Sequence, residues 1–262
     1  MEKLFFKNTV LIVLVHLLTF TLNAQINEPG LITDRPDQTE SSAIVPVSKV
    51  QIETGMVLEN DQSDLIKQKS FVYNSTLLRY GVFSNFELRL GLEYAKDRFI
   101  LNDSATIASG FSPLYTGFKI KISEEDKWLP EIAFLGGFVM PFTAGKDYKP
   151  SYSAANLRFA FSHTLSEMFS IGYNLGMEYD GESAIPGYFY SVAIGIGISE
   201  KIGMFIESYG IIYEEGNAEH LTDFGFTYLL LPGFQIDISA GKGINENATD
   251  YFFGMGLSYL FR

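Results

Sequence analysis

Charged side chains of both signs recur at alternate positions within short apolar stretches of the chain. Between residues 86 and 95, Glu87, Arg89 and Glu93 alternate with leucines. Successive side chains of a strand point to opposite faces, so this spacing would gather the charges on one face. On the inside of a pore, such a face would form a polar constriction that selects solutes by charge and size. The alternative is a self-neutralising set of ion pairs that fills a narrow interior and mainly stabilises it. The candidate residues for such chemistry are Glu53, Arg79, Glu87, Arg89, Glu93, Lys119, Lys121 and Arg158, with Glu178 and Asp237 on the same parity.

Enzymatic chemistry has weaker support. A hydrolytic serine needs an imidazole to activate it and a polar group to orient that imidazole. Beyond residue 24 the chain has His163 and His220. Ser162 falls on the opposite parity from His163, and His220 is expected in a loop, so we predict no catalytic residues and no enzyme.

Metal and cofactor sites are not predicted either. Later connecting segments are acidic, but their spacing matches no dedicated calcium loop, and no phosphate-binding glycine loop or zinc spacing appears. The favoured interpretation is a solvated acidic rim. In the alternative, divalent ions bridge this rim to lipopolysaccharide. The acidic positions concerned are Asp180, Glu182, Glu214, Glu215, Glu219, Glu246 and Asp250.

The elements that would carry these residues are β-strands. Period-two alternation predicts twelve of them, and in most strands an aromatic or aliphatic parity opposes a small or polar one. Strands five and nine of the series alternate less cleanly, so their facing is not fixed. The predicted ranges are 49–59, 70–82, 86–95, 111–122, 130–142, 153–164, 169–179, 187–198, 202–213, 221–230, 234–244 and 251–262.

The last strand and the loop lengths indicate a closed barrel in a membrane. Residues 251–262 have a wide apolar face and end the chain, and an unpaired edge of that kind would invite aggregation unless it closed against the first strand. Connections after even-numbered strands are short, whereas the loops at 60–69, 96–110 and 143–152 are longer and polar. This segregation is typical of outer-membrane barrels, with both termini on the short-turn side. We therefore predict an all-β, up-and-down transmembrane antiparallel barrel of about 12 strands.

The beginning of the chain predicts export. Lys3 and Lys7 precede an apolar run, and Ala24 follows at a suitable cleavage position. These features are typical of a secretory signal peptide over residues 1–24. The predicted organisation is then 1–24 signal peptide, 25–48 N-terminal periplasmic or luminal segment, and 49–262 outer-membrane barrel.

Residues 25–48 differ from the strands. Prolines and dense hydrogen-bonding side chains argue against a lipid-facing strand. Their charges would be costly in lipid but match the charges of the predicted lumen. We interpret this stretch as a plug at the short-turn mouth, with a disordered leader as the alternative. The plug residues are Asp34, Arg35, Pro36, Asp37 and Glu40.

Several motifs resemble one family of bacterial outer-membrane proteins, the "MetA-pathway of phenol degradation" family. The run T-D-R-P-D-Q-T-E-S from Thr33 is followed by V-Q-I-E-T-G from Val50. The hairpin L-L-R-Y-G-V from Leu77 and N-F-E-L-R from Asn85, and the L-P-E at Leu129, also resemble the family pattern. The resemblance implies an outer-membrane barrel and a link to uptake of small organic molecules.

Composition agrees with this class. The 262 residues carry a formal net charge of −12, which argues against nucleic-acid binding. Twenty-three Phe and fifteen Tyr suit many strands in contact with lipid. We predict outer-membrane lipids, lipopolysaccharide and a small solute as partners. The predicted role is passive passage of small organic, including aromatic, solutes, and the alternative is a closed barrel for structure, adhesion or docking.

Overall fold

The computed structural model describes residues 30–62, 66–213 and 218–261. The predicted signal peptide lies outside the described residues. Thirteen strands of this part form one antiparallel sheet that closes on itself, because β1 pairs with β13 and β2 pairs with β3. The strands are β1 (Val50–Gln62), β2 (Ile66–Phe83), β3 (Phe86–Leu101), β4 (Ser104–Phe111), β5 (Leu114–Ser123), β6 (Glu131–Met140), β7 (Ala155–Thr164), β8 (Phe169–Tyr179), β9 (Gly187–Gly197), β10 (Ile202–Tyr213), β11 (Ala218–Leu231), β12 (Phe234–Gly243) and β13 (Tyr251–Phe261).

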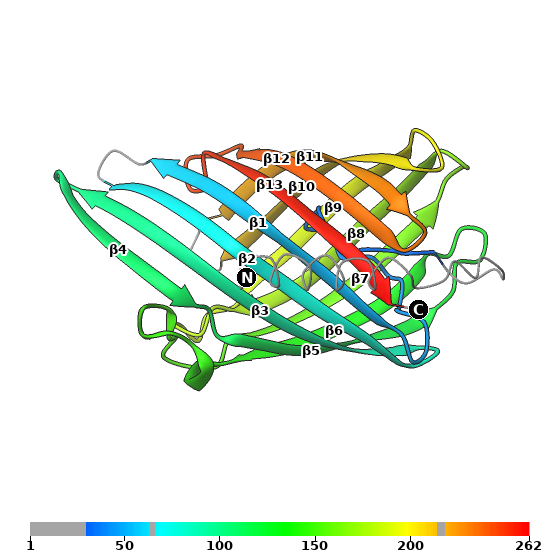
Figure 1. The fold of residues 1–262 in the computed structure, drawn as a ribbon, viewed down its shortest axis with the longest axis horizontal. Helices are drawn as coiled ribbons and strands as arrows, with labels where there is room; N and C mark the ends of the chain where they lie inside the picture. Colours follow the sequence, from blue (N-terminus) through cyan, green and yellow to red (C-terminus); the bar gives the residue numbers. More distant parts are fainter. Residues whose placement is uncertain (1–29, 63–65, 214–217, 262) are drawn as a thin grey trace, which may run out of the picture.

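The barrel wall has twelve strand positions, as predicted. The first half of β3, residues 86–91, pairs with β5, whereas residues 94–101 pair with β4. Strand β4 is therefore the returning arm of a hairpin that extends β3 beyond the rest of the barrel, on the left in Figure 1. Every other strand pairs with its neighbour in sequence, which confirms the meander order.

The predicted loop at 96–110 is wrong. Strand β3 continues to Leu101, and a two-residue turn at Asn102 and Asp103 leads into β4. Both turn residues have positive φ, 47° and 64°, which is the geometry that Asn and Asp tolerate in tight hairpins. The polar composition of this stretch reflects its exposure at the end of the barrel rather than irregular backbone.

The predicted loop at 60–69 is wrong as well, because β1 continues to Gln62 and β2 begins at Ile66, and residues 60–62 pair with 67–69. The segregation of connections by length is therefore seen only in part. At one end tight turns join β2 to β3, β7 to β8, β9 to β10 and β11 to β12. At the other end lies the long connection between β6 and β7, which contains two short 3-10 helices, η1 (Pro141–Thr143) and η2 (Lys146–Tyr148). We refer to these as the short-turn end and the long-loop end. No helix among the described residues is long and apolar enough to span a membrane.

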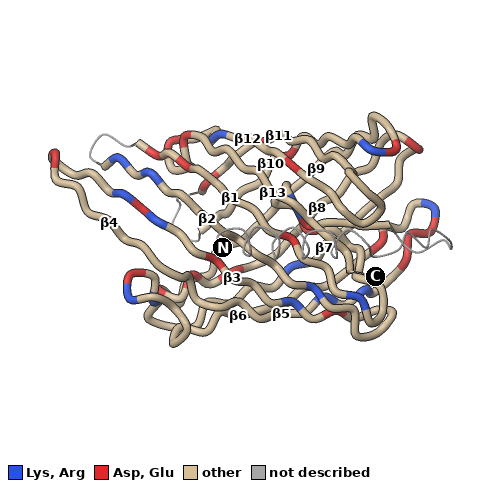
Figure 2. The backbone as a smooth tube through the Cα atoms, in the orientation of Figure 1, with Lys and Arg blue, Asp and Glu red and all other residues tan. Residues whose placement is uncertain are grey.

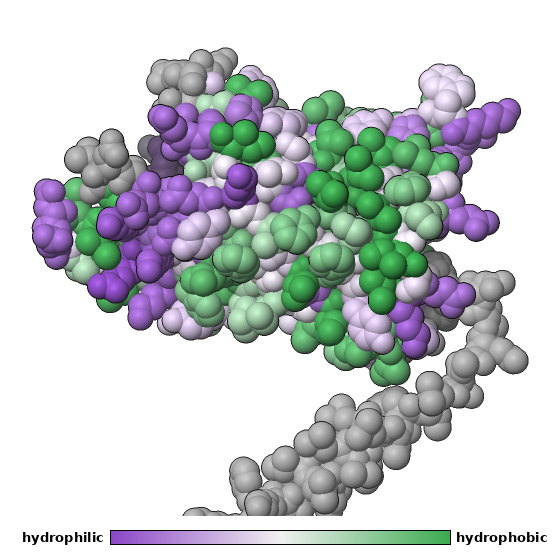
Figure 3. Space-filling view, turned by 90° about the horizontal axis from the view of Figure 1, so that it is seen from above, coloured by the Kyte–Doolittle hydropathy of each residue, from purple (hydrophilic) through white to green (hydrophobic). Residues whose placement is uncertain are grey.

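The outer surface of the wall is apolar. Outward residues of β3, for example Leu88, Leu90 and Leu92, are 38–49% exposed, and the same parity of β13 presents Phe253 and Met255. Figure 3 shows hydrophobic side chains spread over the middle of the barrel, with hydrophilic residues gathered toward its two ends. A band of this kind facing outward on a closed barrel is the surface that contacts the hydrocarbon of a bilayer.

The inner surface is polar, and many of its side chains are fully buried. The largest fully buried side chains are predominantly charged or amide-bearing, and they include Arg79, Lys119, Gln51, Glu53 and Glu87. The facing of predicted strands five and nine is now settled. Strand β6 turns Ala133 and Leu135 inward, and β10 turns Phe205 and Glu207 inward.

Candidate functional site

The N-terminal segment, residues 30–48, runs through the interior of the barrel. We call it the luminal segment. In Figure 1 it appears as the dark blue trace, inside the wall toward the short-turn end. It carries few regular elements of its own, and its polar groups bond to inward side chains of many strands. Thus the segment that is polar in sequence lies where polar partners are available.

Asp34 of the luminal segment is the centre of a buried ion cluster. Its carboxylate lies 3.0 Å from Arg79 Nη1, 2.8 Å from Arg89 Nη1 and 3.0 Å from Lys119 Nζ. These cations come from β2, β3 and β5, three strands that are adjacent at the short-turn end, where Figure 2 shows acidic and basic positions close together. Burial by itself would raise the pKa of Asp34, but the three cations lower it well below its ordinary value.

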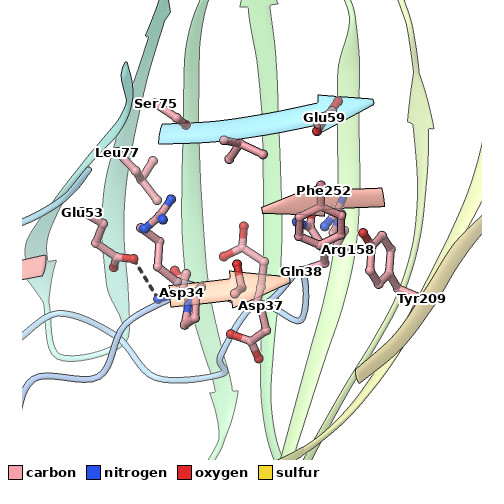
Figure 4. Close-up of a pocket in the computed structure, with 15 residues that line it drawn as sticks. Asp34, Asp37, Gln38, Glu53, Glu59, Ser75, Leu77, Arg158, Tyr209 and Phe252 are labelled. Carbon is pink, nitrogen blue, oxygen red and sulfur yellow. Dashed lines mark hydrogen bonds between the residues drawn. The ribbon is translucent and has the colours of Figure 1, made fainter. Parts of the chain in front are cut away.

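The remaining carboxylates of this cluster belong to the wall. Arg79 donates to both oxygens of Glu87, at 2.9 and 3.0 Å, and to Glu53 Oε1 at 2.9 Å. Glu53 in turn accepts the backbone N–H of Asp34 at 2.9 Å, a bond drawn in Figure 4. Nη2 of Arg89 donates to both carboxylate oxygens of Glu40, at 3.0 and 2.8 Å. Charge-assisted and bidentate bonds of this kind fix both position and orientation.

Two glycines make room for the next side chain of the segment. Gly55 of β1 and Gly256 of β13 face each other in register, and a Cβ on either would lie 2.4 Å from a guanidinium nitrogen of Arg35. Arg35 crosses this gap and pairs with Asp237 of β12 at 3.1 Å. A third glycine, Gly81, allows the backbone of Pro46 to pass, since a Cβ there would approach the Pro46 carbonyl oxygen to 2.2 Å.

The far side of the segment bonds to β8, β9 and β10. Glu207 accepts the backbone N–H of Gln38 at 2.7 Å and the hydroxyl of Thr39. Asn174 accepts from the Glu40 N–H and donates to the Glu40 carbonyl oxygen, at 2.7 and 3.0 Å. The segment is therefore bound on opposite walls of the barrel, across the lumen.

Asp37 contrasts with Asp34. No lysine or arginine of the described chain forms an ion pair with it. Its enclosure in the lumen raises the pKa of the Asp37 carboxyl well above its ordinary value, and the carboxylate of Glu207 raises it further. Thus Asp34 of the luminal segment forms ion pairs with three cations, whereas Asp37 forms none with a described lysine or arginine.

The structure brings together five of the eight residues predicted for selectivity: Glu53, Arg79, Glu87, Arg89 and Lys119. Lys121 lies at the short-turn rim, where it pairs with Glu124 and Glu131. Arg158 pairs with Glu178, and Glu93 accepts from Ser112. The predicted plug residues all belong to the luminal segment. Their roles in selectivity and occlusion remain predictions.

Sequence reasoning missed Glu207 and Asp223. They face each other across β10 and β11, and both are nearly fully buried. Strand β10 sets large residues on both parities, with Phe205 and Tyr209 inside and Ile206 outside, so its polar face could not be recognised. In β11 the exposed Phe224 and Phe226 share one parity and Asp223 lies on the other. This alternation would have identified Asp223 as a residue of the inner face.

The expected loop position of His220 is wrong, because the residue lies in β11 and its Nδ1 is 2.8 Å from the Tyr190 hydroxyl. His163 faces outward with Tyr173, whose hydroxyl is 3.4 Å from its Nε2. Within the described residues, no group of three or more His, Asp or Glu is arranged to hold a metal ion.

Polar cavities lie on both sides of the luminal segment. One, of about 260 Å³, opens toward the long-loop end and is lined by residues that include Glu59, Ser75, Tyr209 and Phe252 (Figure 4). A second, of about 390 Å³, lies toward the short-turn end beside Glu131, Ser162 and Thr164. Asp37 and Glu40 line both cavities, so the segment separates them.

Solved structures with a similar fold are outer-membrane barrels. An outer-membrane channel from Pseudomonas putida F1 aligns with a TM-score of 0.67 and 12% identity, over 91% of this chain and 100% of that one. The translocator domain of the autotransporter NalP from Neisseria meningitidis aligns with a TM-score of 0.54 and 8% identity, over 82% and 90%. The beta domain of the Bordetella autotransporter BrkA gives 0.52 and 10%, over 82% and 100%. At these identities the likeness shows the fold.

No curated protein matches the chain. The model of one protein family, described as "Putative MetA-pathway of phenol degradation", matches residues 33–261. This range includes most of the luminal segment and all of the strands. The closed apolar-banded barrel, its meander order and this match agree with the resemblance seen in the sequence. The chain is an outer-membrane β-barrel and belongs to this family.

Proposed function

We propose that the barrel is a channel for small organic solutes, and that the luminal segment restricts it. The observation that carries this proposal is the pair of polar cavities that meet at Asp37 and Glu40. A barrel filled only for stability would have no reason to keep such spaces on both sides of one segment. The name of the family and the similar channel from Pseudomonas putida F1 support passage rather than catalysis.

Selectivity in this proposal depends on the luminal charges. The cluster around Asp34 is saturated, since its cations and carboxylates satisfy one another, so it would act mainly as an anchor for the segment. Arg158, Glu93 and Lys121 lie outside that cluster and would act on solutes directly, because charged groups that line a pore favour or repel ions by sign. Aromatic solutes remain one class to be screened.

Deletion of residues 25–42 tests the proposal. The wall is held by strand pairing that does not involve these residues, so the truncated chain is expected to fold into the barrel. Single-channel conductance in planar bilayers should increase, because the segment no longer crosses the lumen. Glu182→Gln, which alters an outer loop contact with Ser151, is the matched control and should leave conductance unchanged.

Two results decide the matter. Larger conductance in the truncated barrel, with heat-modifiable gel mobility showing that both proteins are folded, would support a restricted channel. Silence of both folded barrels would reject passage and favour the structural or docking role.

A further inference from the structure

The cavity at the long-loop side of the luminal segment has more acidic than basic side chains. Three of its carboxylates form ion pairs with cations of the Asp34 cluster; they belong to Asp34, Glu40 and Glu53. The other two, on Asp37 and Glu59, form no ion pair with a described lysine or arginine. The cavity therefore presents two carboxylates that no cation of the described chain neutralises.

The two cations that line this cavity are already engaged. Arg35 pairs with Asp237 at 3.1 Å and is confined between Gly55 and Gly256. Arg158 pairs with Glu178 at 3.1 Å, and its guanidinium lies 3.7 Å from the centroid of the Phe189 ring. Neither can turn to Asp37 or Glu59 without losing these contacts.

A further buried acid, Asp223, lies near Phe252, which lines the cavity. Asp223 is 2% exposed, and within the described residues no hydrogen-bond donor reaches either of its carboxylate oxygens, whose polar neighbour is the carboxyl group of Glu207. It faces Glu207 across β10 and points into the lumen beside Phe252, because a Cβ on Gly241 would meet both the Phe252 ring, at 2.3 Å, and Asp223 Cβ, at 2.6 Å. An unpartnered buried carboxylate is costly unless a positive charge or a proton neutralises it.

The remaining lining is aromatic and small. Phe252 and Tyr209 pack in one apolar cluster, and Figure 4 shows their rings on one side of the cavity, with Glu59 above and Asp37 below in that view. Ser75 and Ser239 supply hydroxyls. Carboxylates next to aromatic rings form the usual surroundings of organic ammonium ions, which the ring faces attract electrostatically. A cavity of about 260 Å³ holds more than a bare ion.

We propose that this cavity is a binding site for a small organic cation, a protonated or quaternary amine with an apolar body. Asp37 and Glu59 would contact the ammonium group, and Phe252 and Tyr209 would hold its apolar part. The buried pair of Asp223 and Glu207, near Phe252, would add negative potential. The inference rests on the proposed function, since it names the substrate class of the same lumen.

The test is direct binding of benzyltrimethylammonium to the folded protein purified from outer membranes, with benzyl alcohol as the neutral comparison. Saturable binding of the cation but not of the alcohol is expected. Glu59→Gln should lower the affinity for the cation about tenfold, since a charge-assisted contact contributes that much to binding. The matched control is Asp61→Asn, two residues along the same face of β1 and outside the cavity, which should change affinity less than about twofold.

Asp37→Asn is the second variant, and it lies on the luminal segment, so strand pairing is unaffected. It should weaken binding as Glu59→Gln does. Equal binding of cation and alcohol, no saturable binding, or equal loss in Glu59→Gln and Asp61→Asn would overturn the inference. Conductance of the same preparation separates the two proposals: a conducting barrel that fails these tests refutes the cation site alone, and a silent barrel that passes them refutes passage alone.

Discussion

At the residue scale, the structure depends on charges that are buried and mutually satisfied. Arg79 illustrates this, because a single guanidinium contacts Glu87, Glu53 and Asp34 and also donates to the carbonyl of Ala43. A hydrophobic group of similar volume could fill the same space, so the ion pairs themselves are weak evidence for stability. Their specific consequence is position: they determine where the luminal segment lies.

Replacement of Arg79 should therefore be severe. Arg79→Ala would leave three carboxylates around an empty space, and breaking a buried pair in this way costs about 3–5 kcal/mol. The free energy of unfolding, measured by urea titration in detergent or lipid vesicles, should fall by that amount. Lys121→Ala is the control, because its ion pairs at the rim are partly exposed and contribute about 1 kcal/mol or less. Equal losses in both variants would contradict the importance of burial.

At the element scale, each strand has one face for lipid and one for the lumen. Strand β3 shows the boundary along its length. Leu88, Leu90 and Leu92 face outward near the short-turn end, and the same parity then carries Lys96 and Arg98 toward the long-loop end. Cations in place of leucines indicate that the outer part of the β3–β4 hairpin stands in water rather than in lipid.

A cation within the apolar part of this face should impair assembly. Leu90→Arg or Phe159→Arg would place a guanidinium against hydrocarbon, at a cost of about 2–4 kcal/mol near the bilayer centre. The fraction of protein with heat-modifiable mobility after folding into vesicles should decrease. Leu90→Phe keeps the face apolar and should fold normally. Normal assembly of both arginine variants would show that this face does not contact lipid.

At the scale of the whole molecule, the barrel and the luminal segment are fitted to each other. The glycines at 55, 81 and 256 stand where the segment approaches the wall most closely. In a strand, glycine packs poorly and weakens the sheet, so its presence at these positions is explained by the space that Arg35 and Pro46 occupy.

This fit predicts a specific coupling between wall and segment. Gly256→Val should displace Arg35, loosen the segment and raise single-channel conductance above that of the unmodified protein. In an Arg35→Ala background the valine side chain has free space, so Gly256→Val should raise the conductance little further. A double-mutant cycle of conductance measures this coupling. Equal effects of Gly256→Val in both backgrounds would mean that the valine acts on the wall and not through Arg35.

Much of the wall could be predicted from the sequence alone. Period-two alternation on strands such as β3, β8 and β13 determines two faces by local geometry, and the apolar final strand requires a partner edge, which β1 provides. Five charged positions of the ion cluster were also recognised by parity. These properties are local, since each depends on a residue and its neighbours along the chain.

The site itself was decided by the tertiary structure. Asp34 meets Arg79, Arg89 and Lys119 because closure brings β2, β3 and β5 around one segment, and no spacing in the sequence encodes that convergence. The inward position of Glu207 was hidden by large residues on both parities of β10, and its pairing with Asp223 of β11 follows only from the register of the two strands. Whether a luminal charge forms an ion pair depends on the residues of the opposite wall. Only the closed barrel determines which strands lie opposite each other.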